Sequence, residues 1–370
     1  MIYFDNNATT PIANEVADAM IPYLHGHFGN PSSDHELGYA AKEAVEKARE
    51  QVAKLLNCFK EEIVFTSGGS ESNNMVIKGV SYAYRKSGNH IITSQTEHPS
   101  VINPCRYLEK SGYEISYLPV DQYGVVNPSD VEKAITGKTI LITIMHSNNE
   151  TGTLQPIKEI SQIAKAHEIL FHTDASQSVG KVAIDLSDIG VDFLTIAGHK
   201  MYAPKGIGAL YIRNGIAIEP LVHGAGHESG WRAGTENVIF DVALGKACEM
   251  SMEAVKSSDM RELTKYFHHR LIERFGAIIH LNGHPENRLP NTLNVSFIGY
   301  NGHEILSGLR GVAASTGSAC HSGFTSISPV LKAMGVTDDI GRGAVRFSLG
   351  RYSTKEEVNV VIEKLNNILS

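Results

Sequence analysis

The chain has 370 residues, of which 42% are hydrophobic and 20% are charged, and its formal net charge is −7. This length is enough for a sizeable core and two domains, and the composition is that of a globular protein. The negative charge argues against direct binding of nucleic acid. No apolar run reaches the roughly 18 residues of a membrane span. The start MIYFDNNATTP lacks the basic and apolar regions of a signal peptide, so we expect none.

The four cysteines are widely separated, at positions 58, 105, 248 and 320, and no two of them form a C-x-x-C pair. We therefore expect neither a disulfide framework nor a cysteine zinc site, and a cytoplasmic location fits best. The 17 histidines show no H-E-x-x-H spacing. The sequence therefore predicts no metal site, and a metallohydrolase has little support.

Short apolar runs in the first two thirds of the chain predict seven strands. These runs cover residues 62–67, 90–95, 114–120, 139–146, 169–174, 192–198 and 208–213. Amphipathic segments such as 156–168 lie between several of them, which predicts an α/β fold with a mostly parallel sheet covered on both faces. Ligands bind beyond the carboxyl ends of the strands in such sheets. The polar residues that end these runs are therefore candidates for one common site.

The last third of the chain has a different pattern. A helix is predicted at 257–275, strands at 291–299 and 344–350, and a strand leading into a loop at 312–320. A terminal amphipathic helix is predicted at 354–369 with Thr354 as its N-cap. This order indicates a smaller α+β domain. We expect the N-terminal segment to pack with it.

The segment TSGGSESNN (66–74) joins a strand to a predicted helix through a pair of glycines. Glycines let backbone N–H groups approach an anion, and a helix N-terminus favours negative charge, so this turn can bind a phosphate group. The alternative is a plain strand–helix turn capped by Ser70. Taken alone, the segment favours neither.

Two further strand ends carry groups that suit a flat, nitrogen-containing ring. Asp174, in HTDASQSVG (172–180), is a carboxylate that needs a partner, and a protonated ring nitrogen is one; a helix N-cap is the other. His98, in TEHPS (96–100), can stack on a ring or move protons, or it can be purely structural.

Lys200 follows the apolar run 192–198, in GHKMYAPKG. Burial there would lower the lysine pKa from about 10.4 and make the amine a nucleophile that forms Schiff bases with aldehydes. A phosphate-binding turn, an aspartate for a ring nitrogen and a Schiff-base lysine are together what pyridoxal phosphate (PLP) requires.

Two later residues complete the set of candidates. Cys320 lies in STGSACHSGFTSIS (315–328), a Gly/Ser/Thr segment with no apolar face to bury it, and we expect it to be reactive. Its neighbour His321 either favours the thiolate or is solvated. Arg346, on the strand 344–350, can bind a carboxylate with its guanidinium fork, or it can form an internal ion pair with an Asp or Glu.

The chain resembles the cysteine desulfurases of the NifS/IscS type, within the class V aminotransferase group of fold-type I PLP enzymes. The matching segments run in order over nearly the whole chain: YFDNNATTP, GNPSS, FTSGGSESNN, TEHPS, NNETG, HTDASQSVGK, GHKMYAPKGIGALYIR, RAGTEN, RLPNT, STGSACHSG and VRFSLGRYST. The resemblance implies a homodimer. It also implies a large PLP-binding domain at 16–257 and a small domain, made of 1–15 and 258–370, that carries the cysteine loop.

The resemblance also implies a role for each matching residue. Lys200 would form the Schiff base with PLP, His98 would stack on the ring and help to move protons, and Cys320 would accept sulfur. Asp174 would pair with the ring nitrogen, and Gln177 would donate to the phenolate oxygen. Asn149 and Arg346 would bind the substrate carboxylate. The phosphate would be held by Gly69, Ser70, His199 and, from the other subunit, Thr235.

The chain departs from the family pattern at Ala197, where a serine hydroxyl that binds phosphate is usual. Selenocysteine lyases of the same family also tend to lack this serine, so L-selenocysteine is the alternative substrate to L-cysteine. A catalytically idle scaffold with the same fold is a third interpretation. The implied partner is a sulfur-acceptor protein, such as an Fe–S scaffold or a thiolation protein.

Overall fold

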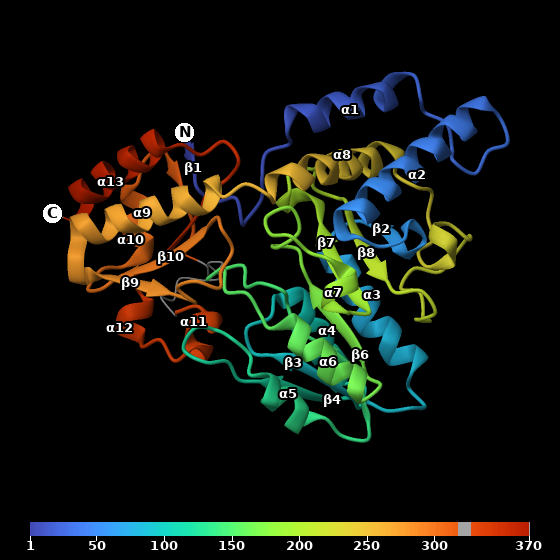
Figure 1. Cartoon of the computed structure of the whole chain (residues 1–370), viewed down its shortest axis with the longest axis horizontal. Helices are drawn as coiled ribbons and strands as arrows, with labels where there is room; N and C mark the ends of the chain where they lie inside the picture. The colour runs from blue at the N-terminus through green and yellow to red at the C-terminus, as the bar shows by residue number, and fades with distance from the viewer. Residues whose placement is uncertain (317–326, 370) are drawn as a thin grey trace.

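The computed structural model describes residues 1–316 and 327–369. Its largest sheet has seven strands in the order β2-β8-β7-β6-β5-β3-β4 (Figure 1). The strands are β2 (Ile63–Thr66), β3 (His90–Ser94), β4 (Glu114–Leu118), β5 (Thr139–Thr143), β6 (Leu170–Asp174), β7 (Phe193–Ala197) and β8 (Gly208–Ile212). Strand β8 pairs antiparallel with β2 and β7, and all other neighbouring strands of this sheet pair in parallel. The predicted mostly parallel seven-stranded sheet is therefore confirmed.

The strands of this sheet carry apolar side chains on both faces, and helices cover both faces. Successive residues of a strand point to opposite faces, and accordingly Ile91 packs in one hydrophobic core while Ile92 packs in the other. The core of Ile91 lies under α3 (Gly69–Ala83) and α4 (Pro99–Glu109). The helices that contribute to the core of Ile92 are α1 (Asn14–His25), α2 (Glu36–Leu56), α5 (Pro128–Ala134), α6 (Ile157–Ala166), α7 (Leu186–Ile189) and α8 (Val238–Ala254).

The last third of the chain forms a second, antiparallel sheet with its own core. Its strands are β9 (Ile279–Asn282), β10 (Thr292–Phe297) and β12 (Ala344–Ser348), in the order β12-β10-β9. The helices of this part are α9 (Asp259–Phe275), α10 (Gly302–Gly308), α11 (Pro329–Ala333), α12 (Asp338–Gly341) and α13 (Lys355–Leu369). Figure 1 shows both chain termini here. The predicted cap at Thr354 is present, because its hydroxyl accepts from the Glu357 N–H and the Glu357 carboxylate accepts from the Thr354 N–H.

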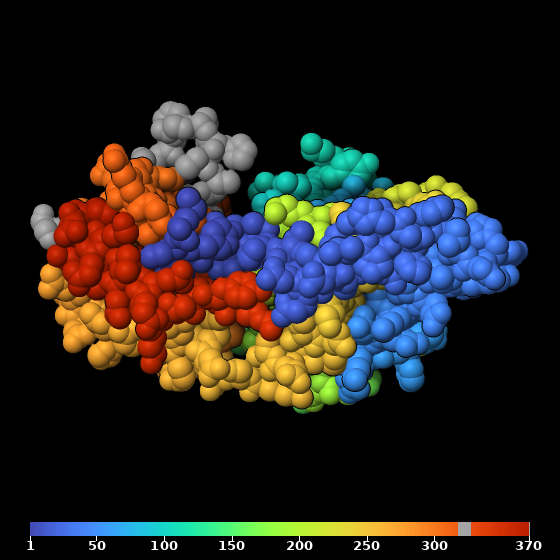
Figure 2. Space-filling view, turned by 90° about the horizontal axis from the view of Figure 1, so that it is seen from above, coloured from blue at the N-terminus to red at the C-terminus, as the bar shows by residue number. Residues whose placement is uncertain are grey.

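The N-terminal segment packs with the second part, as expected, and it also contacts the large sheet. Strand β1 (Ile2–Tyr3) pairs with β11 (Val312–Ala313), at the start of the segment 312–320 predicted as a strand leading into a loop, and Phe4 is buried in the core of the second part. The chain then crosses to the large sheet, where the Thr10 N–H donates to the His199 carbonyl oxygen at 2.8 Å. Figure 2 shows this blue segment running from the red C-terminal part towards the first helices. The domain boundaries at 16–257 and at 1–15 plus 258–370 stay a prediction.

Four short 3₁₀ helices complete the secondary structure of the described residues: η1 (Lys60–Glu62), η2 (Gly198–Lys200), η3 (Glu228–Gly230) and η4 (Gly276–Ile278). Over residues 1–316 and 327–369, no helix has the length and apolar character needed to cross a membrane.

Candidate active site

A cavity of about 560 Å³ lies at the carboxyl ends of the parallel strands. Its walls come from the turns after β2, β3, β5, β6 and β7, from the N-terminal segment and from β12. Nine of the residues predicted for the site line it: Gly69, Ser70, His98, Asn149, Asp174, Gln177, His199, Lys200 and Arg346. The topology thus brings together side chains that are more than 270 residues apart in sequence.

Lys200 reaches the cavity because β7 delivers it there. Strand β7 is buried along its whole length and runs directly into η2, which ends at Lys200. The Lys200 amine donates to the carbonyl oxygens of Asn7 at 2.5 Å and Ala8 at 2.8 Å. Burial and the nearby Arg346 lower the pKa of Lys200 to about 8, although Asp174 and Asp5 oppose the shift. A substantial fraction of this amine is therefore neutral, and nucleophilic, near pH 8.

The turn between β2 and α3 has the form of an anion site. Gly68 adopts φ 143°, which favours glycine, and a Cβ on Gly69 would lie only 2.8 Å from the Ser176 hydroxyl oxygen. The first N–H groups of α3 have no partner within the helix. Ser70 does not cap α3, because the N-cap position belongs to Gly68. His199 lines the same cavity and keeps its ring neutral, since burial and neighbouring lysines lower its pKa to about 4.

Asp174 ends β6, lines the cavity and is almost fully buried. One oxygen accepts from the Ser176 N–H at 2.9 Å and the other from the Asn73 side chain at 2.7 Å. No helix follows β6 directly, so Asp174 is not a helix N-cap. The carboxylate keeps lone pairs for one more donor, such as a protonated ring nitrogen.

The Gln177 amide is oriented by a lysine that the sequence analysis did not single out. The Lys181 amine donates to Gln177 Oε1 at 2.9 Å, and Gln177 Nε2 donates to the Asn7 carbonyl oxygen at 2.9 Å. Burial, Lys200 and Arg346 all lower the pKa of Lys181. Lys181 lies in the quoted segment HTDASQSVGK, but only the folded contact shows that it faces Gln177.

His98 is the N-cap residue of α4 and lines the cavity. Partial burial by the surrounding protein lowers the pKa of the His98 ring. The nearby Lys200 lowers this pKa further, whereas the Asp174 carboxylate raises it. The ring therefore favours its neutral form near pH 7.

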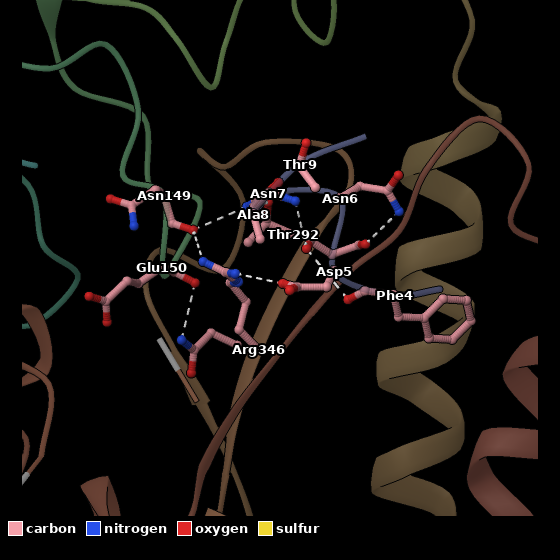
Figure 3. A network of polar contacts seen from close by, with 12 residues as sticks. Phe4, Asp5, Asn6, Asn7, Ala8, Thr9, Asn149, Glu150, Thr292 and Arg346 are labelled. Carbon is pink, nitrogen blue, oxygen red and sulfur yellow. Dashed lines mark hydrogen bonds and ion pairs between the residues drawn. The ribbon is translucent and has the colours of Figure 1, made fainter. Parts of the chain in front are cut away.

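Arg346 enters the site from β12 and forms the internal ion pair that the sequence left open. Its Nη2 donates to Asp5 at 2.7 Å and its Nη1 donates to the Asn149 carbonyl oxygen at 3.0 Å (Figure 3). The Arg346 Nε atom is buried and has no partner among residues 1–316 and 327–369. The expected binding of a substrate carboxylate by Arg346 and the Asn149 side chain stays a prediction.

Asn7 was also not predicted for the site, although it is buried at its centre. Its Nδ2 donates to Thr292 Oγ1 at 2.8 Å and to the Asn149 carbonyl oxygen at 3.2 Å (Figure 3). Its Oδ1 accepts from Lys181 at 3.3 Å and from Asn291 at 3.1 Å. The segment YFDNNATTP shows no periodicity that would predict this burial, which depends on the contact between the two sheets.

The two remaining predicted residues are Thr235 and Cys320. Thr235 is exposed and outside the cavity of its own chain, which agrees with a role in a second copy but does not test it. Cys320 lies outside the described residues, as does His321.

The comparisons with known proteins agree with this geometry. Residues 2–361 match the model of the family described as aminotransferase class-V. The chain belongs to this family. A cysteine desulfurase IscS of Dictyoglomus turgidum is 50% identical over 372 residues, which span 100% of this chain and 94% of that protein. One of Methanosarcina thermophila is 49% identical over 100% of this chain and 92% of its own length.

Solved structures of class-V aminotransferase relatives share the whole fold. A structure described as a NifS-like protein has a TM-score of 0.93 and 38% identity, and the alignment covers 100% of this chain and 99% of that one. A structure described as SspA in complex with cysteine has a TM-score of 0.86 and 39% identity, covering 96% of this chain and 100% of the other. The predicted fold class and family are therefore confirmed.

The class-V family implies PLP as the cofactor, and the described cavity fits it. The fit rests on three features that match three parts of PLP: the N–H groups at the start of α3, which have no partner within the helix, for the phosphate, the Asp174 carboxylate for the ring nitrogen, and the Lys200 amine for the aldehyde. The cavity brings all three to one place.

Proposed function

We propose that this chain is a PLP-dependent cysteine desulfurase, which converts L-cysteine to L-alanine and leaves the sulfur on Cys320 as a persulfide. The observation that carries the proposal is the Lys200 amine, which has a pKa of about 8 and shares one cavity with Asp174 and the N-terminus of α3. The identity to IscS relatives over the whole chain supports the same reaction.

The residues of the cavity would hold the cofactor at several points. Lys200 Nζ would bond its aldehyde carbon, Asp174 would accept from its ring N–H, and Gln177 would donate to its phenolate oxygen. The phosphate would bind at the start of α3, with Gly69, Ser70, His199 and the partner-supplied Thr235, and His98 would cover one ring face. When bound, the cofactor withdraws electrons from the substrate α-carbon.

Proton transfer would fall to Lys200 and His98. Lys200 Nζ, once released from the cofactor, would take the substrate α-proton, because an amine with a pKa of about 8 can be neutral at working pH and can return the proton later. Arg346 and Asn149 would hold the substrate carboxylate. Arg346 donates one N–H of Nη1 to the Asn149 carbonyl oxygen and one of Nη2 to Asp5, and its guanidinium carries five N–H groups, so further N–H groups would bind that carboxylate.

The sulfur step would be a displacement at sulfur. The Cys320 thiolate would attack the substrate sulfur, an S–S bond would form, and the C–S bond would break with its electrons passing to the substrate carbon. That carbon would then be protonated, so L-cysteine and one enzyme thiol give L-alanine and one enzyme persulfide. A Gly/Ser/Thr segment around Cys320 suits this step, since the same thiol must also deliver its sulfur elsewhere.

The test is to incubate the holoenzyme with L-cysteine, measure alanine, and weigh the peptide that contains Cys320. The proposal expects alanine in step with a peptide heavier by one sulfur atom, and it expects Cys320→Ala to bind PLP but yield neither. Persulfide formation by Cys320→Ala would contradict the assigned nucleophile. Much faster turnover of L-selenocysteine than of L-cysteine, retained in Cys320→Ala, would favour the lyase alternative, and a protein that binds no PLP would favour the scaffold.

We also propose that the chain works as a homodimer in the cytoplasm and passes sulfur to an acceptor protein, such as an Fe–S scaffold or a thiolation protein. The exposed position of Thr235 supports the dimer, because the family role of that residue is in the other subunit's site. A reducing compartment is supported by the need of Cys320 for a free thiol.

A further inference from the structure

Two side chains to which no role has been given join two of the groups that would flank the cofactor ring. Asn73 lies in α3 and is fully buried. Its Nδ2 donates to Asp174 Oδ2 at 2.7 Å and to Ser100 Oγ at 2.8 Å. The Ser100 hydroxyl is in turn 2.8 Å from His98 Nδ1. A continuous chain of hydrogen bonds therefore connects the end of β6 with the start of α4.

The donor and the acceptor of each of these hydrogen bonds can be assigned, because amide and backbone N–H groups can donate but cannot accept. The Ser100 backbone N–H donates to His98 Nδ1 at 3.2 Å, so Nδ1 carries a lone pair. The Asn73 amide donates to the Ser100 oxygen, which leaves the single hydroxyl proton of Ser100 for Nδ1. The bonds thus run from Asn73 to Asp174 in one direction and from Asn73 through Ser100 to His98 in the other. With Nδ1 an acceptor, the proton of the neutral ring lies on Nε2.

We propose that Asn73 and Ser100 are positioning residues which fix His98 as the neutral Nε2–H tautomer and hold Asp174 as an acceptor. This inference rests on the proposed function, in which His98 covers the cofactor ring and Asp174 binds its nitrogen. The neutral His98 ring would then present only its Nε2–H group to the cavity, as a hydrogen-bond donor, because its single ring lone pair, on Nδ1, accepts from Ser100. One amide, Asn73, would serve both groups.

The charges around His98 support a neutral ring. The charged groups that act on it are Asp174, from β6, which raises its pKa, and Lys200, from η2, which lowers it. Glu97 precedes it, but burial raises the pKa of Glu97 to about 8, so that carboxyl is mostly neutral at pH 7. His98 also sits at the N-cap of α4, where the helix dipole disfavours an imidazolium. The pair of bonds from Ser100 acts in the same direction as Lys200 and the dipole.

The test uses the holoenzyme with ¹⁵N-labelled histidine and reads the tautomer of His98 by NMR, with His98→Gln to assign its signals. The proposal expects Nε2–H in the unaltered protein. In Ser100→Ala the backbone donor remains and the hydroxyl is lost, so the ratio of Nε2–H to Nδ1–H should fall about fivefold, the effect of one neutral hydrogen bond. The pKa of His98 should rise, and the pH profile of kcat should shift in the same direction.

Matched variants separate positioning from a merely structural effect. Ser100→Thr keeps a hydroxyl and should restore the tautomer ratio. Asn73→Ala should shift both the tautomer and the visible spectrum of the bound cofactor, whereas Asn74→Ala, one residue further along α3, should shift neither. An Nδ1–H ring in the unaltered protein, or a tautomer and pKa unchanged in Ser100→Ala, would overturn the inference. The NMR reading is independent of turnover, so a failure of the proposed function is seen separately, as absent PLP binding or absent alanine.

Discussion

The substitution Asn7→Ala tests how much the hydrogen bonds of Asn7, at the contact between the two sheets, contribute to the stability of the protein. Asn7 is 1% exposed, and its side chain makes four hydrogen bonds, two as donor through Nδ2 and two as acceptor through Oδ1. A net 0.5–1.5 kcal/mol for each bond gives a loss of about 2–6 kcal/mol in the free energy of unfolding. The Asn7 carbonyl oxygen, which accepts from Lys200 and Gln177, remains in the variant.

The assay is urea unfolding of the cofactor-free protein, so that cofactor binding does not add to stability. The control is Asn89→Ala, which removes one exposed bond to the Gly112 carbonyl oxygen and should cost less than about 1 kcal/mol. If Asn7→Ala cost no more than this control, the buried network around Asn7 would not hold the two sheets together, and the reasoning would be wrong.

Three further predictions concern the cofactor site. Ala197→Ser should return a hydroxyl to the cavity wall and tighten PLP binding about fivefold in an absorbance titration; unchanged or weaker binding would contradict it. Lys181→Met should weaken PLP binding about fivefold, because the Gln177 amide oxygen loses one hydrogen-bond donor; an unaltered Kd would show that Gln177 needs no such support. The stability of the cofactor-free protein should rise with pH between about 8 and 10.5, because the unfolded chain keeps the Lys200 proton that the folded chain has lost. Lys200→Met should reduce that rise, and an equal rise in the variant would contradict the lowered pKa.

The large sheet could be predicted because each of its strands is a short apolar run. The same pattern placed Asp174 and Lys200 at strand ends, and the rule that ligands bind at the carboxyl ends of parallel strands then brought them together. Those residues are local to the strands, so no knowledge of distant contacts was needed.

The remaining parts of the site depend on contacts between distant segments. Asn7 is buried only because the N-terminal segment crosses between the two sheets, and no local pattern records that path. No local sequence pattern marks Lys181 or Asn73 as a site residue. Only the fold shows that Lys181 donates to Gln177 and that Asn73 donates to Asp174. For Arg346 the sequence left two partners open, and the fold supplied Asp5.

The central claim is that Lys200 holds the cofactor, and borohydride reduction of the holoenzyme followed by peptide mass analysis tests it most directly. Borohydride fixes the cofactor to whichever lysine it is bonded to. The account predicts the added mass on the peptide that contains Lys200. The same mass on the peptide that contains Lys181, or on neither, would contradict it.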